Sequence, residues 1–374
     1  MILSSGKNIR RDALRVVVVS QYLDTKVGGA ERYIREICSR LEADHMMDIH
    51  YLSADNAKTS DLSLPCCRFL TSGFHPVWPR QAGYALSRFD PDVLYAHFTV
   101  PGITDIVVRA AERRGIPVCL MYHSDVTGPQ WIKRALGRIY YKAVGKRTLT
   151  ACHTIFLSSF AYAKASPYLR EPKTRYVVAP PGVDTLMAKG KRWPDTFFLL
   201  FVGKPDVRSK GFHLLKRAWH ELRREWAGLE MVVIGSTKRH RPDTAFGLHY
   251  VGEIDSRRQL ADWYASASVT VLPSISSESF GIVLAEALVG GCPVVGSRIG
   301  GIPSLVEPGV NGYLASPGSV VSLVEALNAA LENNSILRSN IAARHGEYLD
   351  RFNWGRITDT VARTLTTAAH GPGD

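Results

Sequence analysis

The stretch RVVVVS at residues 15–20 is a near-continuous apolar run, and the glycine pair Gly28-Gly29 follows it before helical spacing of apolar residues begins at Arg32–Leu41. An apolar run without alternation is typical of a strand buried on both faces of a parallel sheet. A buried strand, a glycine turn and an amphipathic helix together form the first part of a β-α unit. The start of the chain therefore predicts an α/β fold.

The same alternation of short strands and longer helices extends along the chain in two series. Periodicity lapses between the series, where Pro and Gly cluster from Pro180 to Pro194. We therefore expect two Rossmann-like, doubly wound domains at residues 1–185 and 186–350, followed by a helical segment at 351–374. Two such domains bind a ligand in the crevice at the carboxyl ends of their strands. The strand candidates are residues 15–20, 49–52, 93–97, 118–123, 154–158 and 176–179 in the first series, and 197–203, 230–235, 248–251, 269–273 and 293–297 in the second.

Length and composition agree with this organisation. A chain of 374 residues is longer than one hydrophobic core normally supports, and 45% hydrophobic and 21% charged residues are ordinary for a globular protein. No apolar run is long enough to span a membrane, and the polar, basic start Met1–Leu14 does not resemble a signal peptide. We therefore expect a cytoplasmic protein. The six cysteines form no C-x-x-C pair and no metal-ligand spacing, so we expect them to be structural.

Positive charge is concentrated in the first half of the chain. The formal net charge is +12, and residues 1–190 hold 26 Lys and Arg against 16 Asp and Glu, whereas the remainder is nearly neutral. This asymmetry predicts that the first half meets an anionic partner, such as a phosphorylated acceptor or a membrane surface. Nucleic acid is the weakest candidate, because no recognised binding motif accompanies the charge.

One basic amphipathic segment lies in that half, at residues 131–147. Such a helix can lie on an anionic membrane, which would place the protein at the inner face of the cell membrane. A surface helix that packs by its apolar face is the alternative. The residues at helical spacing are Trp131, Ile132, Leu136, Ile139 and Tyr140, and the basic residues around them are Lys133, Arg134, Arg138, Lys142, Lys146 and Arg147.

The strongest functional signal is SESFGIVLAEA at residues 277–287, where a strand ending at Pro273 leads through a polar turn into a helix. We expect the helix to begin near Phe280, with Gly281 allowing a ligand to approach the first turn closely. The free N–H groups of a first turn, together with the helix dipole, form an anion-binding site. The stretch therefore predicts a phosphate site.

Two glutamates flank that site. Glu278 precedes the helix, and Glu286 lies about two turns along it. A diphosphate held at the helix start would lie between the two carboxylates, one able to hold a ribose diol and the other near a sugar. In the alternative interpretation, Glu286 is a partly buried helix carboxylate with a local partner and Glu278 is an exposed turn residue.

Two lysines follow a second predicted strand, in the stretch Phe201–Gly211. Lys204 comes directly after Gly203, and Lys210 lies six residues further on. Cations at the carboxyl end of a strand can neutralise the charge that develops on a departing nucleoside diphosphate. A pair of solvated loop lysines is the alternative.

The first half adds a glycine pair and two histidines. Gly28-Gly29 alone most often marks a tight turn, and it is not a dinucleotide or P-loop fingerprint. His123 follows the buried strand 118–121 and is expected to point into the cleft, although a structural histidine is the alternative. His97 has the same placement after its own strand, and we assign acceptor-binding roles to His97 and Gly28.

Together these motifs resemble the retaining family 4 glycosyltransferases of GT-B fold, in which two glutamates separated by seven residues bracket an F-G turn. The resemblance continues through Gly290–Val295, Gly300–Val306 and Asn311–Leu314, and covers nearly the whole chain. It implies that the first domain binds the acceptor and the second the nucleotide sugar. It also implies that the helices at 351–374 cross back onto the first domain.

The resemblance further implies roles for single residues. Glu278 would contact the donor's sugar and phosphates, Glu286 the ribose hydroxyls, and His123 the transferred sugar. The family usually has Arg at the position of Lys204, so this chain departs from the pattern there. The expected catalytic residues are His123, Lys204, Lys210 and Glu278, and the expected donor-binding residues are Gly29, Gly203, Val251, Glu253, Ile254, Phe280, Gly281, Ile282, Val283 and Glu286.

The activity that the resemblance implies is transfer of a hexose, with retention of configuration, from a nucleotide-diphosphate sugar to a glycan or lipid-linked acceptor. Likeness of residues 123–169 to bacterial surface-polysaccharide mannosyl- and rhamnosyltransferase-like sequences favours a mannose-like sugar. The resemblance also implies a front-face displacement. We expect no metal or other cofactor, because Asp90-Pro91-Asp92, which superficially matches a D-x-D metal motif, precedes its strand rather than following it. A GT-B-type sugar-nucleotide epimerase or phosphorylase and a non-catalytic nucleotide-sugar-binding scaffold are the alternatives.

Overall fold

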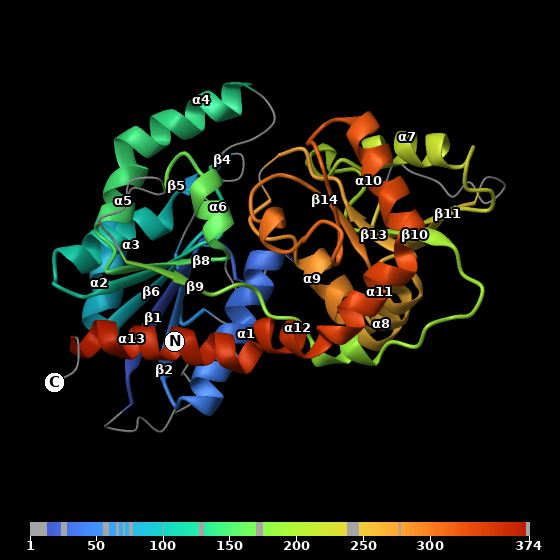
Figure 1. Cartoon of the computed structure of the whole chain (residues 1–374). Helices are drawn as coiled ribbons and strands as arrows, with labels where there is room; N and C mark the ends of the chain where they lie inside the picture. Colours follow the sequence, from blue (N-terminus) through green and yellow to red (C-terminus); the bar gives the residue numbers. More distant parts are fainter. Residues whose placement is uncertain are drawn as a thin grey trace.

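The computed structural model of the protein describes residues 13–23, 28–54, 60–64, 67–69, 72–74, 78–99, 101–126, 131–169, 175–237, 247–276 and 278–371, with the backbone alone at 67–69, 72–74 and 131–134. These residues form two α/β units side by side, one from each half of the chain (Figure 1). No helix among them is long and apolar enough to cross a membrane.

The sheet of the N-terminal unit is parallel throughout, in the order β3-β2-β1-β6-β7-β8-β9. Its central strand β1 is buried on both faces, as the apolar run predicts. Val17 and Val19 pack in the core on the side of α2 and α3, whereas Val16 and Val18 pack in the core that includes α1 and α13. The strands are β1 (Arg15–Ser20), β2 (Asp48–Ser53), β3 (Leu62–Ser63), β6 (Val93–Phe98), β7 (Val118–Tyr122), β8 (Thr154–Leu157) and β9 (Arg175–Val178), and a separate antiparallel pair is β4 (Cys67–Phe69) and β5 (Ser72–Phe74).

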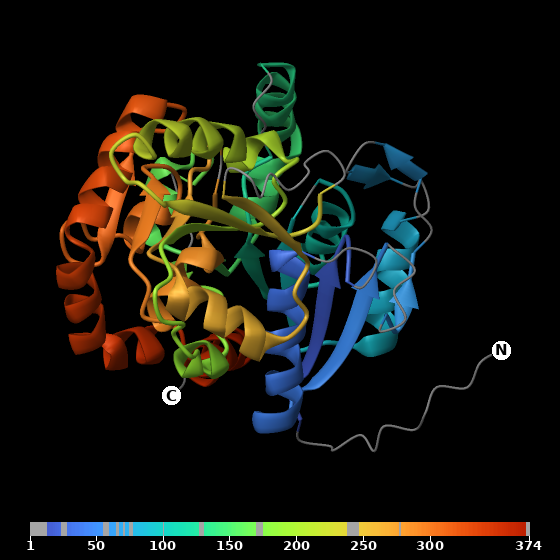
Figure 2. The ribbon, with the colours of Figure 1, turned by 90° about the vertical axis from the view of Figure 1, so that its right-hand side faces the viewer.

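The helices of this unit cover both faces of the sheet. Figure 2 shows α1 along the boundary between the two units. The helices are α1 (Gly29–Asp44), α2 (Trp78–Phe89), α3 (Ile103–Glu112), α4 (Trp131–Tyr140), the π-helical turn η1 (Tyr141–Gly145), α5 (Lys146–Thr150) and α6 (Phe160–Ala165).

The sheet of the C-terminal unit is also parallel, in the order β12-β11-β10-β13-β14-β15. Its strands are β10 (Phe198–Val202), β11 (Glu230–Ile234), β12 (Leu248–Gly252), β13 (Val269–Leu272), β14 (Val294–Ser297) and β15 (Gly312–Ala315). Its helices are η3 (Arg208–Lys210), α7 (Phe212–Leu222), α8 (Arg257–Ser266), α9 (Ile282–Val289), η5 (Ile302–Ser304), α10 (Val320–Glu332), α11 (Asn334–Ala343) and α12 (His345–Arg351).

Both sheets reverse their strand order at the first strand of the unit. β1 lies between β2 and β6, and β10 lies between β11 and β13. In doubly wound sheets such a reversal opens a crevice at the carboxyl ends of the strands, where ligands bind. The loops that carry Gly28, Lys210 and Glu278 follow β1, β10 and β13, so the topology brings all three to these reversals.

The last helix, α13 (Trp354–His370), packs on the N-terminal unit. Ile357, Val361 and Leu365 are buried in the same core as Val16 and Val18. Gly182 lets the chain pass close to the start of this helix, because an added Cβ would lie 2.4 Å from the Trp354 ring.

The prediction of an α/β fold with parallel sheets is confirmed, with local differences. Residues 312–315, which were not among the predicted strands, form β15, and the expected helix start at Phe280 lies two residues later, at Ile282. The delay has a backbone cause, because Gly281 adopts φ +91° and cannot be part of a right-handed helix. Strands β3, β4 and β5 were not predicted, because runs of two or three residues carry no periodicity.

Candidate active site in the interdomain cleft

A cavity of about 1240 Å³ lies between the two units. Its wall from the N-terminal unit comes mainly from α1 and from the end of β7, and its wall from the C-terminal unit from α8, α9 and the loops before them. Nine of the residues predicted from the sequence line it: Gly28, Gly29, His123, Lys210, Glu278, Phe280, Gly281, Ile282 and Glu286.

The start of α9 has the geometry of an anion site. Gly281, at the N-cap position, provides no side-chain hydrogen bond to the first turn. The Leu284 amide donates to the Gly281 carbonyl at 2.9 Å, so the amides of Ile282 and Val283 are the ones of that turn left for a ligand. The loop before the helix is held by close backbone packing. The Gly301 amide donates to the Glu278 carbonyl at 2.9 Å, and a Cβ on Gly300 would lie 2.0 Å from that oxygen. The glycine pair 300–301 therefore fixes the approach to the helix.

Glu278 and Lys210 form an ion pair within the C-terminal unit. The Nζ of Lys210 lies 2.7 Å from Oε2 of Glu278, and the hydroxyl of Ser274 donates to the same oxygen at 3.3 Å. Gly211 places Lys210 there, because its φ of +72° and the Pro273 carbonyl, 1.9 Å from an added Cβ, both require glycine. The carboxylate and the ammonium thus meet beside the start of α9.

Glu286 is buried in a different set of partners. Its side chain is 5% exposed, and Tyr264 from α8 donates to Oε2 at 3.0 Å. Burial raises the pKa of the Tyr264 phenol well above its ordinary value, with the neighbouring Glu286 carboxylate adding to it, so the hydroxyl keeps its proton. Arg32, from α1 of the other unit, donates to Oε1 at 3.0 Å, and Arg257 lies 4.0 Å from the same oxygen. Glu286 is therefore a buried, charged acceptor at the cavity wall.

On the N-terminal side, the half-buried His123 contacts the fully buried His97. Nδ1 of His97 lies 3.0 Å from Nε2 of His123. Burial lowers the pKa of both rings well below the ordinary value, and for His97 the neighbouring ring lowers it further. Both rings are therefore neutral near pH 7, and one of the two facing nitrogens donates to the other. With Nε2 engaged, Nδ1 is the ring nitrogen of His123 left for a ligand.

Some predicted residues lie elsewhere. His97 is fully buried behind His123 and is not among the residues lining the cavity, because its ring packs against Tyr33 and Tyr95. Lys204 is exposed at the end of β10. Neither it nor the other five predicted residues of the C-terminal unit line the cavity: Gly203, Val251, Glu253, Ile254 and Val283. The residues around Val251 do not line the cavity because β12 is the edge strand of its sheet, two strands away from β10.

Three residues at the site were not assigned roles from the sequence. Arg32 stands directly after the Gly-Gly-Ala-Glu turn, so its position on the first turn of α1 was a usable signal. Arg257 begins α8, where a basic residue is an ordinary surface choice. Tyr264 is buried in the middle of α8, and no pattern in the sequence distinguishes it from a core tyrosine.

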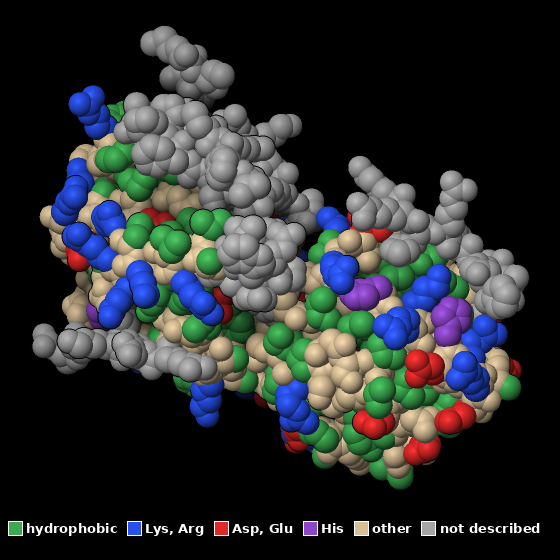
Figure 3. Space-filling view, turned by 90° about the horizontal axis from the view of Figure 1, so that it is seen from above, with side chains coloured by type: hydrophobic (Ala, Val, Ile, Leu, Met, Phe, Trp, Pro, Cys, Tyr) green, Lys and Arg blue, Asp and Glu red, His purple; other side chains and the backbone are tan. Residues whose placement is uncertain are grey.

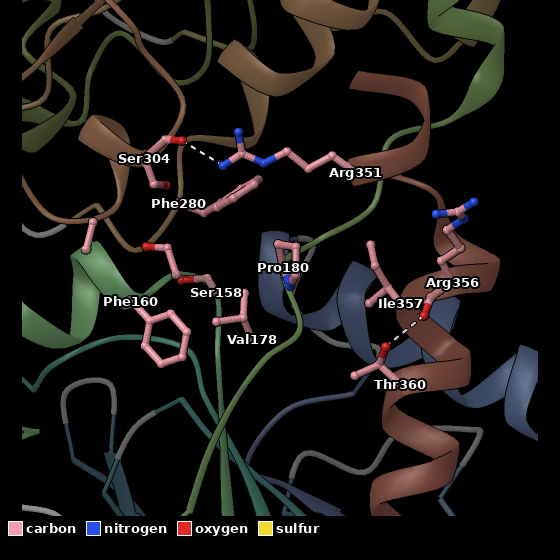
Figure 4. A pocket seen from close by; sticks show the side chains of 12 residues that line it. Ser158, Phe160, Val178, Pro180, Phe280, Ser304, Arg351, Arg356, Ile357 and Thr360 are labelled. Atoms are coloured by element: carbon pink, nitrogen blue, oxygen red, sulfur yellow. Dashed lines mark hydrogen bonds between the residues drawn. The ribbon is translucent and has the colours of Figure 1, made fainter. Parts of the chain in front are cut away.

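A second, smaller cavity of about 450 Å³ lies near the start of α13 (Figure 4). Ser158, Val178 and Pro180 line it from the N-terminal unit, and Arg351 and Ile357 line it from α12 and α13. Of the residues predicted for the site it contains Phe280 alone. The larger cavity is therefore the candidate active site.

Comparison with known proteins agrees with this placement. A family model described as Glycosyltransferase Family 4 matches residues 27–185, and one described as Glycosyl transferases group 1 matches residues 196–333. Both models describe glycosyltransferases, and this chain is a glycosyltransferase of GT-B fold. The first match covers the unit with the glycine pair, and the second covers the unit with both glutamates, so the family assignment spans both walls of the cavity.

Relatives among the glycosyltransferases are distant, and they match over different lengths of the chain. The chain is 29% identical to a phosphatidyl-myo-inositol mannosyltransferase of Mycobacterium leprae over 46% of each chain. It is 22% identical to the enzyme of the same name from Mycolicibacterium smegmatis over 95% of this chain and 94% of that one.

Solved structures confirm the GT-B fold. A sucrose-phosphate synthase from Thermosynechococcus elongatus superposes with a TM-score of 0.73 at 18% identity, covering 95% of this chain and all of the other. Anabaena HepE in complex with UDP-glucose superposes with a TM-score of 0.65 at 18% identity, covering 94% of this chain and 99% of that one.

Proposed function

We propose that this glycosyltransferase transfers a hexose, with mannose favoured, from a nucleotide-diphosphate sugar to a glycan or lipid-linked acceptor, with retention of configuration. The observation that carries the proposal is the start of α9, where Glu278, Glu286 and Lys210 surround one cavity and the Gly28-Gly29 turn faces them from the other unit. A negatively charged diphosphate fits between a helix start and a lysine.

The donor would bind along α9. Its diphosphate would lie at the first turn, its ribose at Glu286, and its sugar near Glu278 and the neutral His123. Lys210 and the helix dipole would stabilise the charge that develops on the leaving diphosphate, which is the task that a metal ion performs in other transferases. We therefore propose a metal-independent reaction in which the leaving phosphate accepts the acceptor's proton on the same face of the sugar.

A mannose-like sugar and a lipid-linked acceptor are supported by the relatives and by charge. The mycobacterial relatives are named as phosphatidyl-myo-inositol mannosyltransferases, whose named acceptor is a lipid. The positive charge of residues 1–190 lies in the unit assigned to the acceptor. A cationic surface there would attract an anionic acceptor or the membrane that contains it.

The segment α4–α5 supports contact with an anionic membrane. Ile139 and Leu136 are 64% and 53% exposed, an unfavourable position for large apolar side chains in water. Arg138, Lys142 and Lys146 are exposed near them, and Figure 3 shows Lys and Arg side chains beside hydrophobic ones on this face of the N-terminal unit. On an anionic membrane, the apolar side chains would insert partially and leave water, and the basic side chains would pair with the lipid headgroups.

Two measurements test the proposal. A thermal-shift panel with UDP, GDP, ADP and dTDP should raise the midpoint most for the preferred base, because a ligand that binds the native state stabilises it. Incubation with the corresponding labelled sugar donors and a lipid extract should then yield a glycosylated product with the donor's anomeric configuration. An inverted product would refute retention. Interconversion of the nucleotide sugar without an acceptor would favour an epimerase, and binding without turnover would favour a scaffold.

A further inference from the structure

The arginine that donates to Glu286 comes from the other unit of the protein. Arg32 belongs to α1, and 254 residues separate it from Glu286 in the sequence. Its side chain is 21% exposed and lines the cavity, whereas Tyr264, the second partner of Glu286, is fully buried in the C-terminal unit. The face of Glu286 that a ligand could reach from the cavity is therefore the face that Arg32 covers.

A ribose diol and an arginine would use that carboxylate in the same way. Two vicinal hydroxyls can donate a pair of hydrogen bonds to a carboxylate, and a guanidinium donates to it from a planar fork. In this structure Oε1 accepts from Arg32 and Oε2 accepts from Tyr264. A ribose arriving from the cavity would have to displace the arginine.

A displaced Arg32 would have a second acceptor close by. Its Nε is buried, and no residue that the structure describes accepts a hydrogen bond from it. An unsatisfied buried donor on a charged group is costly, so the guanidinium is suited to a further anionic partner. The diphosphate proposed at the start of α9 is such a partner, and Lys204, the second cation predicted for it, is exposed and does not line the cavity.

We propose that Arg32 changes partners when the nucleotide sugar binds. While the nucleotide-sugar site is empty, Arg32 pairs with Glu286 across the cleft. When the nucleotide sugar binds, its ribose takes the place of Arg32 on Glu286, and Arg32 pairs with the diphosphate. Arg32 would thus supply, from the N-terminal unit, the second cation of the leaving-group site. The exchange would also tie donor binding to the relative position of the units, because the Arg32–Glu286 ion pair and the bond from Ser158 to the Ser279 carbonyl, at 2.6 Å, both join them. This inference rests on the proposed donor site.

The two parts of the exchange predict effects of opposite sign. R32A removes the hydrogen bond to Oε1 of Glu286 and leaves Arg257 at 4.0 Å from that oxygen. The nucleoside of the preferred base should therefore bind R32A more tightly, by about threefold to tenfold, because the binding-competent state is more populated. The corresponding nucleoside diphosphate should bind R32A more weakly, by about tenfold, because a charge-assisted hydrogen bond to it is lost. R32K keeps a charge without the planar fork, so the nucleoside should again gain while the diphosphate loses less than about threefold.

Isothermal titration of nucleoside and diphosphate against wild type, R32A, R32K and R35A tests the exchange. Arg35 is the matched control, because it lines the same cavity from the same helix and is exposed; R35A should not tighten nucleoside binding. Weaker binding of both ligands to R32A, or unchanged binding of both, would overturn the inference. If R32A does not fold, R32K replaces it: tighter binding of the nucleoside to R32K supports the inference, and unchanged or weaker binding overturns it. Failure of wild type to bind any of the four nucleoside diphosphates would instead refute the proposed function.

Discussion

The two walls of the cavity hold their polar groups in different ways. On the C-terminal wall, Lys210 and Glu278 are charged, paired with each other, and fixed by glycines that pack against backbone carbonyls. On the N-terminal wall, His123 is a half-buried, neutral ring that contacts the fully buried His97 behind it, and Gly29 has no atom within 4 Å of an added Cβ. The first wall is suited to stabilising charge in a fixed geometry. The second places a neutral imidazole beside the cationic side chains of Arg32 and Arg35, and it leaves room beside its glycine turn.

The largest effect should come from removing charge on the C-terminal wall. E278Q keeps the shape of the side chain but weakens its pairing with Lys210 and its acceptor strength. We expect kcat to fall about 10²–10³-fold, in the range of a lost electrostatic stabiliser, with a much smaller change in nucleoside diphosphate affinity. Steady-state kinetics with the preferred donor measure kcat, and inhibition by the nucleoside diphosphate measures its affinity. A kcat within a few fold of wild type would assign Glu278 to structure instead.

Glycine substitutions should separate the walls by stability. G211A places a Cβ against the Pro273 carbonyl at φ +72°, so we expect a loss of about 2–3 kcal/mol in the free energy of unfolding. G29A, at the first residue of α1, meets no atom and should change it by less than about 1 kcal/mol. Urea unfolding of both variants checks the contrast, and equal losses would show that the two turns are equally constrained.

The histidine pair should make stability depend on pH. Both folded-state pKa values are depressed, so the unfolded chain binds more protons below its own pKa of about 6.5, and protonation favours unfolding. Stability should be fully present above about pH 7 and fall as pH drops below 6.5, by up to about 1.4 kcal/mol per pH unit for each histidine. H97Q should flatten the profile of unfolding free energy between pH 7 and pH 5. If the slope of unfolding free energy against pH is unchanged in H97Q, the histidine pair is not the source of the pH dependence.

The smallest effect concerns the outer surface of the N-terminal unit. I139S removes an apolar side chain that is 64% exposed, at little cost to folding. We expect binding to vesicles of anionic lipid to weaken about threefold to tenfold, with no binding to zwitterionic vesicles in either form. Vesicle sedimentation measures this. I336S, on α11 of the other unit and 56% exposed at the wild-type residue, is the matched control and should bind as wild type does. Equal loss in both variants would contradict a role for α4.

The fold and the C-terminal wall were largely predictable because their signals are local. The runs at Arg15–Ser20 and Phe198–Val202 are strands in the structure, and the glutamates, the F-G turn and the α9 start lie within one short stretch whose backbone fixes their relative positions. That Val251 and Ile254 do not line the cavity could not be predicted, because the sequence gives no strand order and β12 lies at a sheet edge. That His97 lies behind His123 could not be predicted either, because a residue that ends a strand can face either the cleft or the core.

The sequence by itself determined that the chain is a two-unit α/β protein with a helix start between two carboxylates, since each of these depends on residues close together in the chain. The tertiary structure decided which groups from distant segments meet: Arg32 with Glu286, His97 with His123, and α13 with the first sheet. Local propensity does not encode such contacts, because they depend on strand order within a sheet and on how distant segments pack against each other.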